Sequence, residues 1–254
     1  MAYKISDTAI MIESDGKAIL IADSLEYVNN FTVTTDVYDL PDNYFTTYFP
    51  VLSPVQGSAS GYSSGGSPVQ PGENVANTID KFPFSTDANA TDVGNLSVSR
   101  YGGAGASSLS HGYTAGGYSV TNVIDKFPFS VDTNATDVGD LTQAREGIAG
   151  QSSSNNGYAS GGLKGGPPFR ANTIDKFPFA ADANATDVGD LTVERRYLVG
   201  QSSTENGYSS GGDPGAGVNI IEKFPFSTDA NATDVGDLTQ ARYGAGGQSS
   251  SANG

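Results

Sequence analysis

The sequence predicts an all-β protein built from repeated modules, with a small β-rich segment in front of them. A stretch of twenty residues recurs four times with few changes, starting at Asn77, Asn122, Asn172 and Asn219. The 254 residues include 33 Gly and 12 Pro, which suits many tight turns and little helix. Inside the recurring stretch the apolar residues alternate with a period of two, which is typical of strands.

Residues 1–56 form the first predicted segment. The run AIMIESDGKAILIA holds two apolar stretches around Asp15 and Gly16, a strong signal for a two-residue hairpin. The run FTVTTDVYDLPDNYFTTYFPV that follows is rich in Tyr, Phe, Val and Thr, with a turn at residues 41–43. We therefore expect a β-rich N-terminal domain at 1–56 and a separate repeat domain at 57–254.

The repeats share a constant frame and one loop of variable length. The marker tyrosines Tyr62, Tyr113, Tyr158 and Tyr208 are separated by 51, 45 and 50 residues. When the segment between the Gly pair and the Asn is removed, each spacing becomes 41 residues. Insertions confined to one place mean that each module is a supersecondary unit whose variable loops emerge from a single face. These loops are residues 67–76, 118–121, 163–171 and 213–218.

Each frame has room for four short strands: the run after the repeated Arg, the GYxxGG segment, the KFPF segment and the VGDL segment. In the third module Phe177 and Phe179 fall on one face of the pleat and Ile174 on the other. Pro178 cannot donate to a ladder, which favours an outer strand or a bulge. We expect Phe-x-Phe and the Leu to fill a core that only stacked neighbours can close.

The modules resemble kelch-type β-propeller repeats, in which a strand ending in a Gly pair is followed by an acidic turn and then by an Arg. The matching residues in the third module are Tyr158 with Gly161 and Gly162, the DANATD turn from Asp182, and Arg195. The usual Trp of that family is missing, and Val188 stands near its position. The resemblance implies a propeller of four or more four-stranded blades over 57–254. A β-solenoid or a trimeric β-fibre is the alternative architecture.

The opening YKISDTAIMI is similar to the start of fibre and tail proteins of marine bacteriophages, through Tyr3, Lys4, Ile5, Ser6 and Thr8. Together with the repeats, this resemblance implies a structural protein of the virion, assembled in the host cytoplasm. A tail fibre or another exposed appendage is the expected place. The N-terminal segment would then attach to other virion proteins, and a homo-oligomer is expected.

Composition argues against several other classes. With 13 basic and 28 acidic residues the net charge is −15, which disfavours nucleic-acid binding. No apolar run approaches the roughly 20 residues of a membrane span. No Cys and a single His, His111, leave little material for catalysis, so we expect no enzyme and no required cofactor. The alternatives are a propeller-based glycan-active enzyme and an intracellular kelch adaptor.

The repeated D-x-N-x-T-D-x-G-D pattern suggests two interpretations. Oxygen side chains at positions 1, 3, 5 and 9 resemble calcium ligands, although the Gly stands at position 8 rather than 6. Asp and Asn also form Asx turns without metal, which is the outcome we expect. The candidate calcium ligands are Asp87, Asn89, Asp132, Asn134, Asp140, Asp182, Asn184, Asp190, Asp229, Asn231 and Asp237.

The remaining polar repeats are interpreted as scaffold and the variable loops as specificity. Asp175 and Lys176 point to opposite faces of a strand, so they favour salt bridges between strands or modules, and the repeated Arg is expected to bind a carboxylate or exposed carbonyls. Loops vary without disturbing a frame, so binding of a host-surface carbohydrate or protein is assigned to them. The candidate binding residues are Lys164, Phe169, Arg170, Tyr118, Glu73 and Asp213.

Overall fold

The computed structural model describes the backbone of four N-terminal strands and, in the repeats, residues 59–67, 75–118 and 121–250. The chain divides into two units, Met1–Leu52 and Ser53–Gly254. All regular structure in the described residues is antiparallel β-sheet, which confirms the all-β prediction. In this part of the chain no helix is long and apolar enough to cross a membrane.

The N-terminal unit contains one sheet with the strand order β3-β2-β1-β4. Its strands are β1 (Ala2–Ser6), β2 (Ala9–Ser14), β3 (Lys17–Ala22) and β4 (Val37–Tyr38). Strands β2 and β3 pair in register from Ala9 opposite Ala22 to Ser14 opposite Lys17. This register confirms the predicted hairpin, because only two residues separate the paired ends.

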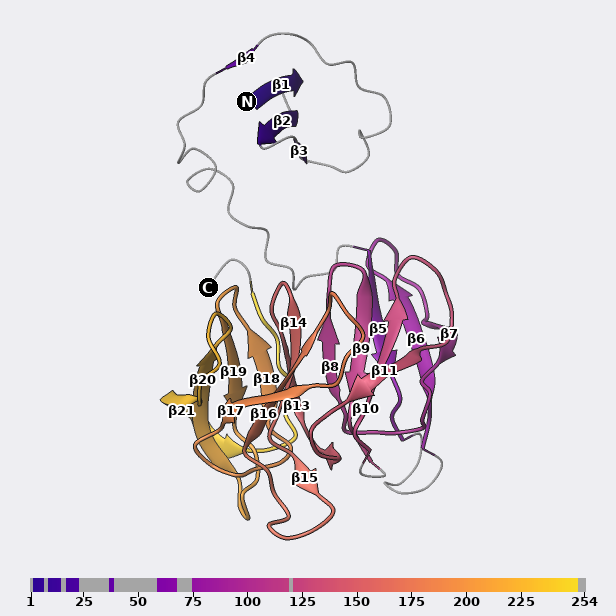
Figure 1. Ribbon diagram of the computed structural model, residues 1–254. Coiled ribbons are helices and arrows are strands. Elements are labelled where there is room, and N and C mark those ends of the chain that lie inside the picture. Colours follow the sequence, from indigo (N-terminus) through magenta and orange to yellow (C-terminus); the bar gives the residue numbers. More distant parts are fainter. Residues whose placement is uncertain are drawn as a thin grey trace. The chain divides into compact units, whose positions relative to one another are not determined.

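The repeat unit consists of four main sheets, one for each module (Figure 1). The first contains β5 (Ser60–Ser64), β6 (Thr78–Pro83) and β7 (Thr91–Asn95). The second contains β8 (Ala104–Ser107), β9 (His111–Ala115), β10 (Val123–Pro128) and β11 (Thr136–Asp140). The third contains β13 (Ala149–Ser152), β14 (Asn156–Ser160), β16 (Thr173–Pro178) and β17 (Thr186–Asp190). The fourth contains β18 (Val199–Ser202), β19 (Asn206–Ser210), β20 (Val218–Pro225) and β21 (Thr233–Arg242).

Strand order follows chain order inside each main sheet, so the predicted run of four strands per module is confirmed in the second, third and fourth. A short ladder of β12 (Arg145–Glu146) and β15 (Leu163–Lys164) was not predicted. Pro178 departs from the expectation of an outer strand or a bulge. It ends the inner strand β16, beyond the last residue paired with β17, Lys176, so no ladder hydrogen bond to β17 is lost there.

The GY dipeptide and the KFPF segment fit together across neighbouring strands. Gly157 lies directly opposite Phe177 in the β14–β16 ladder, and a Cβ on this glycine would come within 2.3 Å of the Phe177 ring. The ring therefore covers the glycine backbone, as an aromatic residue often does beside a strand glycine. The same geometry recurs at Gly61, Gly112 and Gly207, which explains why a glycine precedes every marker tyrosine.

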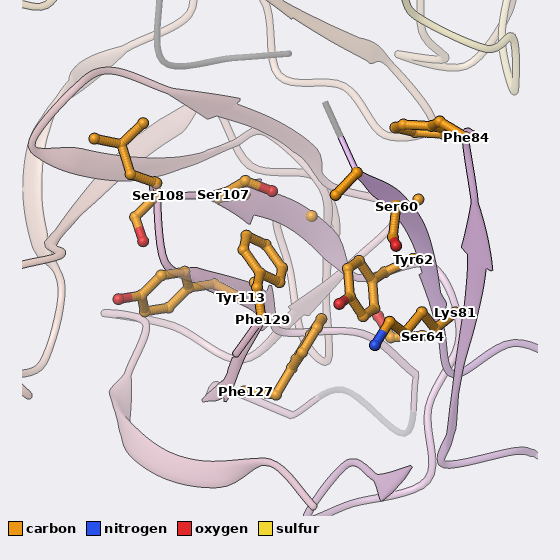
Figure 2. A pocket seen from close by; sticks show the side chains of 16 residues that line it. Ser60, Tyr62, Ser64, Lys81, Phe84, Ser107, Ser108, Tyr113, Phe127 and Phe129 are labelled. Carbon is orange, nitrogen blue, oxygen red and sulfur yellow. The ribbon is translucent and has the colours of Figure 1, made fainter. Parts of the chain in front are cut away.

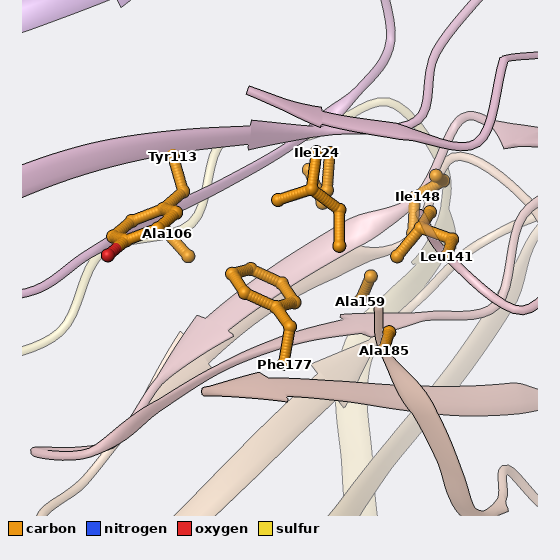
Figure 3. Packing of buried hydrophobic residues seen from close by; sticks show 10 residues of the cluster. Ala106, Tyr113, Ile124, Leu141, Ile148, Ala159, Phe177 and Ala185 are labelled. Atoms are coloured by element: carbon orange, nitrogen blue, oxygen red, sulfur yellow. The ribbon is translucent and has the colours of Figure 1, made fainter. Parts of the chain in front are cut away.

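The hydrophobic core lies between consecutive sheets (Figure 3). Between the second and third sheets, Tyr113, Ile124 and Leu141 meet Phe177 and the half-buried Phe179. Ile174 lies on the other face of β16 and belongs to the next cluster, with Tyr158 and Phe224. Each sheet thus presents Tyr, Ile and Leu to the following sheet and Phe-x-Phe to the preceding one, which confirms that neighbouring modules close each other's core.

The described strands do not form a closed ring. The core clusters join the first sheet to the second, the second to the third, and the third to the fourth. The sheets carrying β5–β7 and β18–β21 stand at the two ends of this series (Figure 1).

Candidate binding face

In the second, third and fourth sheets, a buried arginine fixes the end from which the variable loop emerges. Arg145 has no exposed side-chain surface and donates to the carbonyl oxygens of Gly161 (2.7 Å) and Thr173 (2.9 Å) and to the Asp175 carboxylate (2.6 Å). These three acceptors belong to the Gly-pair segment and to β16, on either side of the variable loop. Arg100 with Asp125 and Arg195 with Glu222 repeat the ion pair. The expected role of the repeated Arg is therefore confirmed for Arg100, Arg145 and Arg195, whereas Arg242 is exposed and pairs with no carboxylate of the described residues.

The residue after this arginine lies beside the residue that opens the variable loop. Tyr118 donates its backbone N–H to the carbonyl of Tyr101 at 2.8 Å, and Asp213 does the same to Arg196 at 2.8 Å. Glu146 stands opposite Leu163 in the β12–β15 ladder. Both members of every pair differ between modules, although the backbone beneath them is constant. We call this set the variable face: Tyr101, Tyr118, Glu146, Leu163, Arg170, Arg196, Tyr197, Asp213 and Tyr243.

Aromatic rings occupy two parts of the variable face. The rings of Tyr101 and Tyr118 are stacked, with centroids 4.7 Å apart and an interplanar angle of 20°. The Arg196 guanidinium lies over the ring of Tyr197, 5.0 Å from its centroid, and Tyr243 is tilted against the same ring at 6.5 Å. Tyrosines in such pairs provide flat apolar surfaces with a hydroxyl at the edge.

A charged cluster links two variable loops. Arg170 donates Nε–H to the carbonyl of Asp213 at 2.8 Å, and Arg196 donates Nε–H to the Asp213 carboxylate at 3.1 Å. Burial alone would raise the pKa of Asp213, but the hydrogen bonds from Arg196 and the Gly215 N–H, with the charge of Arg170, lower it below the ordinary value. Asp213 is therefore a fixed anion that holds both guanidinium groups in place.

Glu146 is the one member of the variable face with a buried acid oxygen that lacks a partner in the described structure. Its side chain is 7% exposed, and Oε2 accepts no hydrogen bond from the described residues. Burial raises the pKa of this carboxyl, and the charge of Arg196 opposes the rise only in part. The Glu146 charge also adds to the burial that raises the pKa of Tyr101. The carboxyl is thus electrostatically connected to both parts of the face.

The structure brings together some of the predicted binding residues. Arg170 and Asp213 form an ion pair at 3.5 Å, and Tyr118 lies on the same face against Tyr101. Lys164 is in β15, where its N–H binds the carbonyl of Phe169, whose side chain is 57% exposed. Glu73 lies outside the described residues. Tyr101, Glu146, Arg196 and Tyr197 were missed, although comparing the positions after each repeated Arg would have found them.

The D-x-N turns connect one sheet to the next. Lys176 binds Asp229 at 2.5 Å, and the pairs Lys81–Asp132 and Lys126–Asp182 repeat this contact. The backbone N–H of Asp190 donates to Asn231 Oδ1 at 3.0 Å, and Asn134 and Asn184 accept the equivalent bonds. The second Asp of each turn accepts the N–H two residues later, as in Asp187 with Gly189, which confirms the Asx turns. Among the described residues no group of three or more acidic or His side chains is placed to hold a metal ion.

A pocket of about 580 Å³ lies between the first and second sheets (Figure 2). Its walls are β5 and β8, together with Tyr62, Tyr113, Phe127 and Phe129. It follows the edge of β5, at the position that β8, β13 and β18 hold in the other sheets. The pocket therefore follows the edge of the first sheet.

No protein-family model matches this sequence, and no curated protein matches it.

Proposed function

We propose that this chain is a non-enzymatic structural component of a bacteriophage virion, a tail fibre or another exposed appendage. Its repeat unit is a kelch-like β-propeller array that presents the variable face to the host surface. The proposal rests on a difference between two parts of the repeat. The residues that pack one sheet against the next are nearly constant, whereas the residues at one end of each sheet differ from module to module.

The chemistry of the variable face favours a carbohydrate ligand. Stacked tyrosines such as Tyr101 and Tyr118 offer flat surfaces for the apolar faces of sugar rings. Arg170, Arg196 and Asp213 supply donors and acceptors in fixed positions beside them. A few oriented polar groups among aromatic rings are typical of small-molecule recognition sites. The YKIS-type start supports attachment of the N-terminal unit to the particle.

The first experiment is mass spectrometry of purified virions of the phage that encodes the chain. The proposal expects its peptides in the particle at a stoichiometry typical of structural proteins. Peptides found only in infected cytosol, and absent from virions, would contradict it.

The second experiment compares host-cell adsorption of the purified chain with that of the double variant Tyr101→Ser/Tyr118→Ser. Loss of the stacked pair should weaken adsorption at least tenfold while the melting temperature changes little. Leu109→Ser is the matched control, because Leu109 is 85% exposed and lies outside the variable face. Equal adsorption of all three proteins would remove this face from recognition.

A further inference from the structure

The three joints between consecutive sheets are made of the same contacts. A Tyr of one sheet stacks on the second Phe of the next: Tyr62–Phe129 at 5.0 Å, Tyr113–Phe179 at 4.8 Å and Tyr158–Phe226 at 4.8 Å. A Lys of one sheet pairs with the turn Asp of the next, and a buried Arg pairs with a carboxylate on the next sheet's third strand. Each joint therefore has a trailing half, with Tyr, Lys and Arg, and a leading half, with Phe, Asp and Asn.

The fourth sheet presents a trailing half, and no described residue makes the contacts of a leading half with it. Tyr208 and Ile221 are half-exposed, although their counterparts Tyr158 and Ile174 are buried. Arg242 is exposed, and among the described residues its guanidinium binds Thr239 and the carbonyl of Gln240. Its counterparts Arg100, Arg145 and Arg195 are buried in ion pairs.

Gly236 marks the same difference in the backbone. A Cβ at the equivalent Gly94, Gly139 or Gly189 would lie 2.4 to 2.5 Å from a carbonyl oxygen of the following sheet. At Gly236 a Cβ would meet no atom within 4 Å. Gly236 therefore leaves room for a neighbouring D-x-N turn, as the glycines at the other three positions do.

The first sheet presents the matching leading half. Phe82 and Phe84 are 39% and 53% exposed, whereas the first-Phe counterparts Phe127, Phe177 and Phe224 are 5% exposed or less. Asp87 and Asn89 are exposed, and no arginine of the described chain pairs with Asp80, although Asp125, Asp175 and Glu222 each have one.

We propose that a second copy of this chain docks head to tail, with its first sheet packed on the fourth sheet of its neighbour through a fourth joint of the same kind. The contacts match one to one: Tyr208 with Phe84, Lys223 with Asp87, and Arg242 with Asp80. Both halves carry apolar surface surrounded by opposite charges, which provides affinity and fixes the register. The two halves lie at opposite ends of the described series, so one copy does not bring them together (Figure 1).

The joint also determines which symmetry is available. A contact between two different surfaces is heterologous, and it produces a closed ring when the rotation closes and an open filament when it does not. Either product grows with protein concentration, and both need the same contact between Arg242 and Asp80.

Sedimentation velocity of the 254-residue chain over a range of concentrations, compared with Arg242→Asp, tests the proposal. The wild type should associate, and Arg242→Asp should weaken association at least tenfold because two carboxylates then face each other. Its melting temperature in dilute solution should stay unchanged, since Arg242 is exposed. Lys164→Asp, which makes the same change of charge away from both end sheets, should associate like the wild type.

A substitution on the other side of the proposed contact tests the association independently. Asp80→Arg should also weaken association, and the double variant Asp80→Arg/Arg242→Asp should regain at least part of it. A wild-type chain that is monomeric at every concentration, because another segment or molecule covers the end sheets, would overturn the proposal. Association that survives Arg242→Asp would overturn it as well, because a different surface would then hold the copies together.

Discussion

The buried arginines stabilise the repeat unit by holding two strand ends and a carboxylate at once. Arg145 and Asp175 are fully buried, and Asp175 also accepts hydrogen bonds from the N–H and hydroxyl of Thr142. Removing one member of a buried ion pair leaves the other charge without compensation, and this costs about 3–5 kcal/mol. Replacing both members of a buried ion pair with apolar groups of similar volume is, by contrast, often neutral or stabilising.

Arg145→Met should therefore lower the free energy of unfolding by about 3–5 kcal/mol in urea titrations. The double variant Arg145→Met/Asp175→Leu should be less destabilised than the sum of the two single variants, because no unpaired charge remains. Strict additivity would show that the two side chains do not act as a pair.

Glu146 makes stability depend on pH. A carboxyl whose pKa is raised by burial binds its proton more tightly in the folded chain than in the unfolded one. Its contribution to stability is therefore favourable at low pH, and it is lost as the pH rises from the ordinary value of 4.5 towards the raised pKa.

Glu146→Gln should raise the melting temperature at neutral pH, because the glutamine needs no proton. At about pH 3 the Glu146 carboxyl holds its proton in both the folded and the unfolded chain. The difference in melting temperature between the variant and the wild type should therefore shrink there. Thermal melts across this range decide it. A variant that is less stable than the wild type at neutral pH would mean that the charge of Glu146 is compensated in the fold.

Residue-level prediction from the sequence succeeded where the repeat itself carried the signal. The Asp175-Lys176 dipeptide indicated salt bridges, and both residues form them. Their partners could not be predicted, because Arg145 and Asp229 come within reach only when the sheets stack. Glu146 and Tyr101 were missed because they lie outside the loops of variable length, although the position that they share also differs between modules.

The first strands of the second, third and fourth sheets, β8, β13 and β18, approach one another through their glycines. A Cβ at Gly150 would lie 2.1 Å from the carbonyl oxygen of Gly105, and one at Gly200 would lie 2.0 Å from that of Gly150. At Gly105 a Cβ would meet no atom within 4 Å. Two positions with the same local sequence context thus differ only in what lies beside them.

Gly150→Ala should destabilise the repeat unit by about 1–3 kcal/mol, because the methyl group forces neighbouring strands apart. Gly105→Ala is its control and should stay within about 0.5 kcal/mol of the wild type. Chemical denaturation of both variants measures the difference. Equal effects would mean that close stacking of these strands does not limit stability.

The four strands of the second, third and fourth modules were predictable because alternation and glycine-rich turns are local signals. The β12–β15 ladder was not, since Glu146 and Leu163 have no repeated pattern. The place of Pro178 was mistaken because the prediction concerned the whole strand, whereas the last two residues of β16, Phe177 and Pro178, lie beyond the ladder to β17.

At the scale of the whole molecule, stability comes from joints between sheets, and the D-x-N turns form part of them. In the second, third and fourth modules their oxygens already accept hydrogen bonds from lysines and backbone N–H groups of the preceding sheet, as Asp229 and Asn231 do. A calcium ion would have to displace these contacts.

The melting temperature after calcium addition should therefore stay within about 1 °C of its value after chelation. Calcium bound only to the folded chain would raise it. Differential scanning calorimetry with and without the chelator measures this. A rise with calcium that the chelator reverses would restore the metal interpretation of these turns.

The central claim is that stacked sheets of constant sequence carry a variable face that can be exchanged between modules and that binds the host surface. The most direct measurement replaces residues 163–171, LKGGPPFRA, with the four-residue YSVT of the second module, and then compares thermal melting and host-cell adsorption. Loop length changes stability little, and the second sheet closes with the shorter loop, so the melting temperature should remain within a few degrees. Adsorption should fall at least tenfold, because Arg170 no longer binds Asp213 and Phe169 is lost. Unfolding on exchange would contradict the constant frame, and unchanged adsorption would contradict the recognition face.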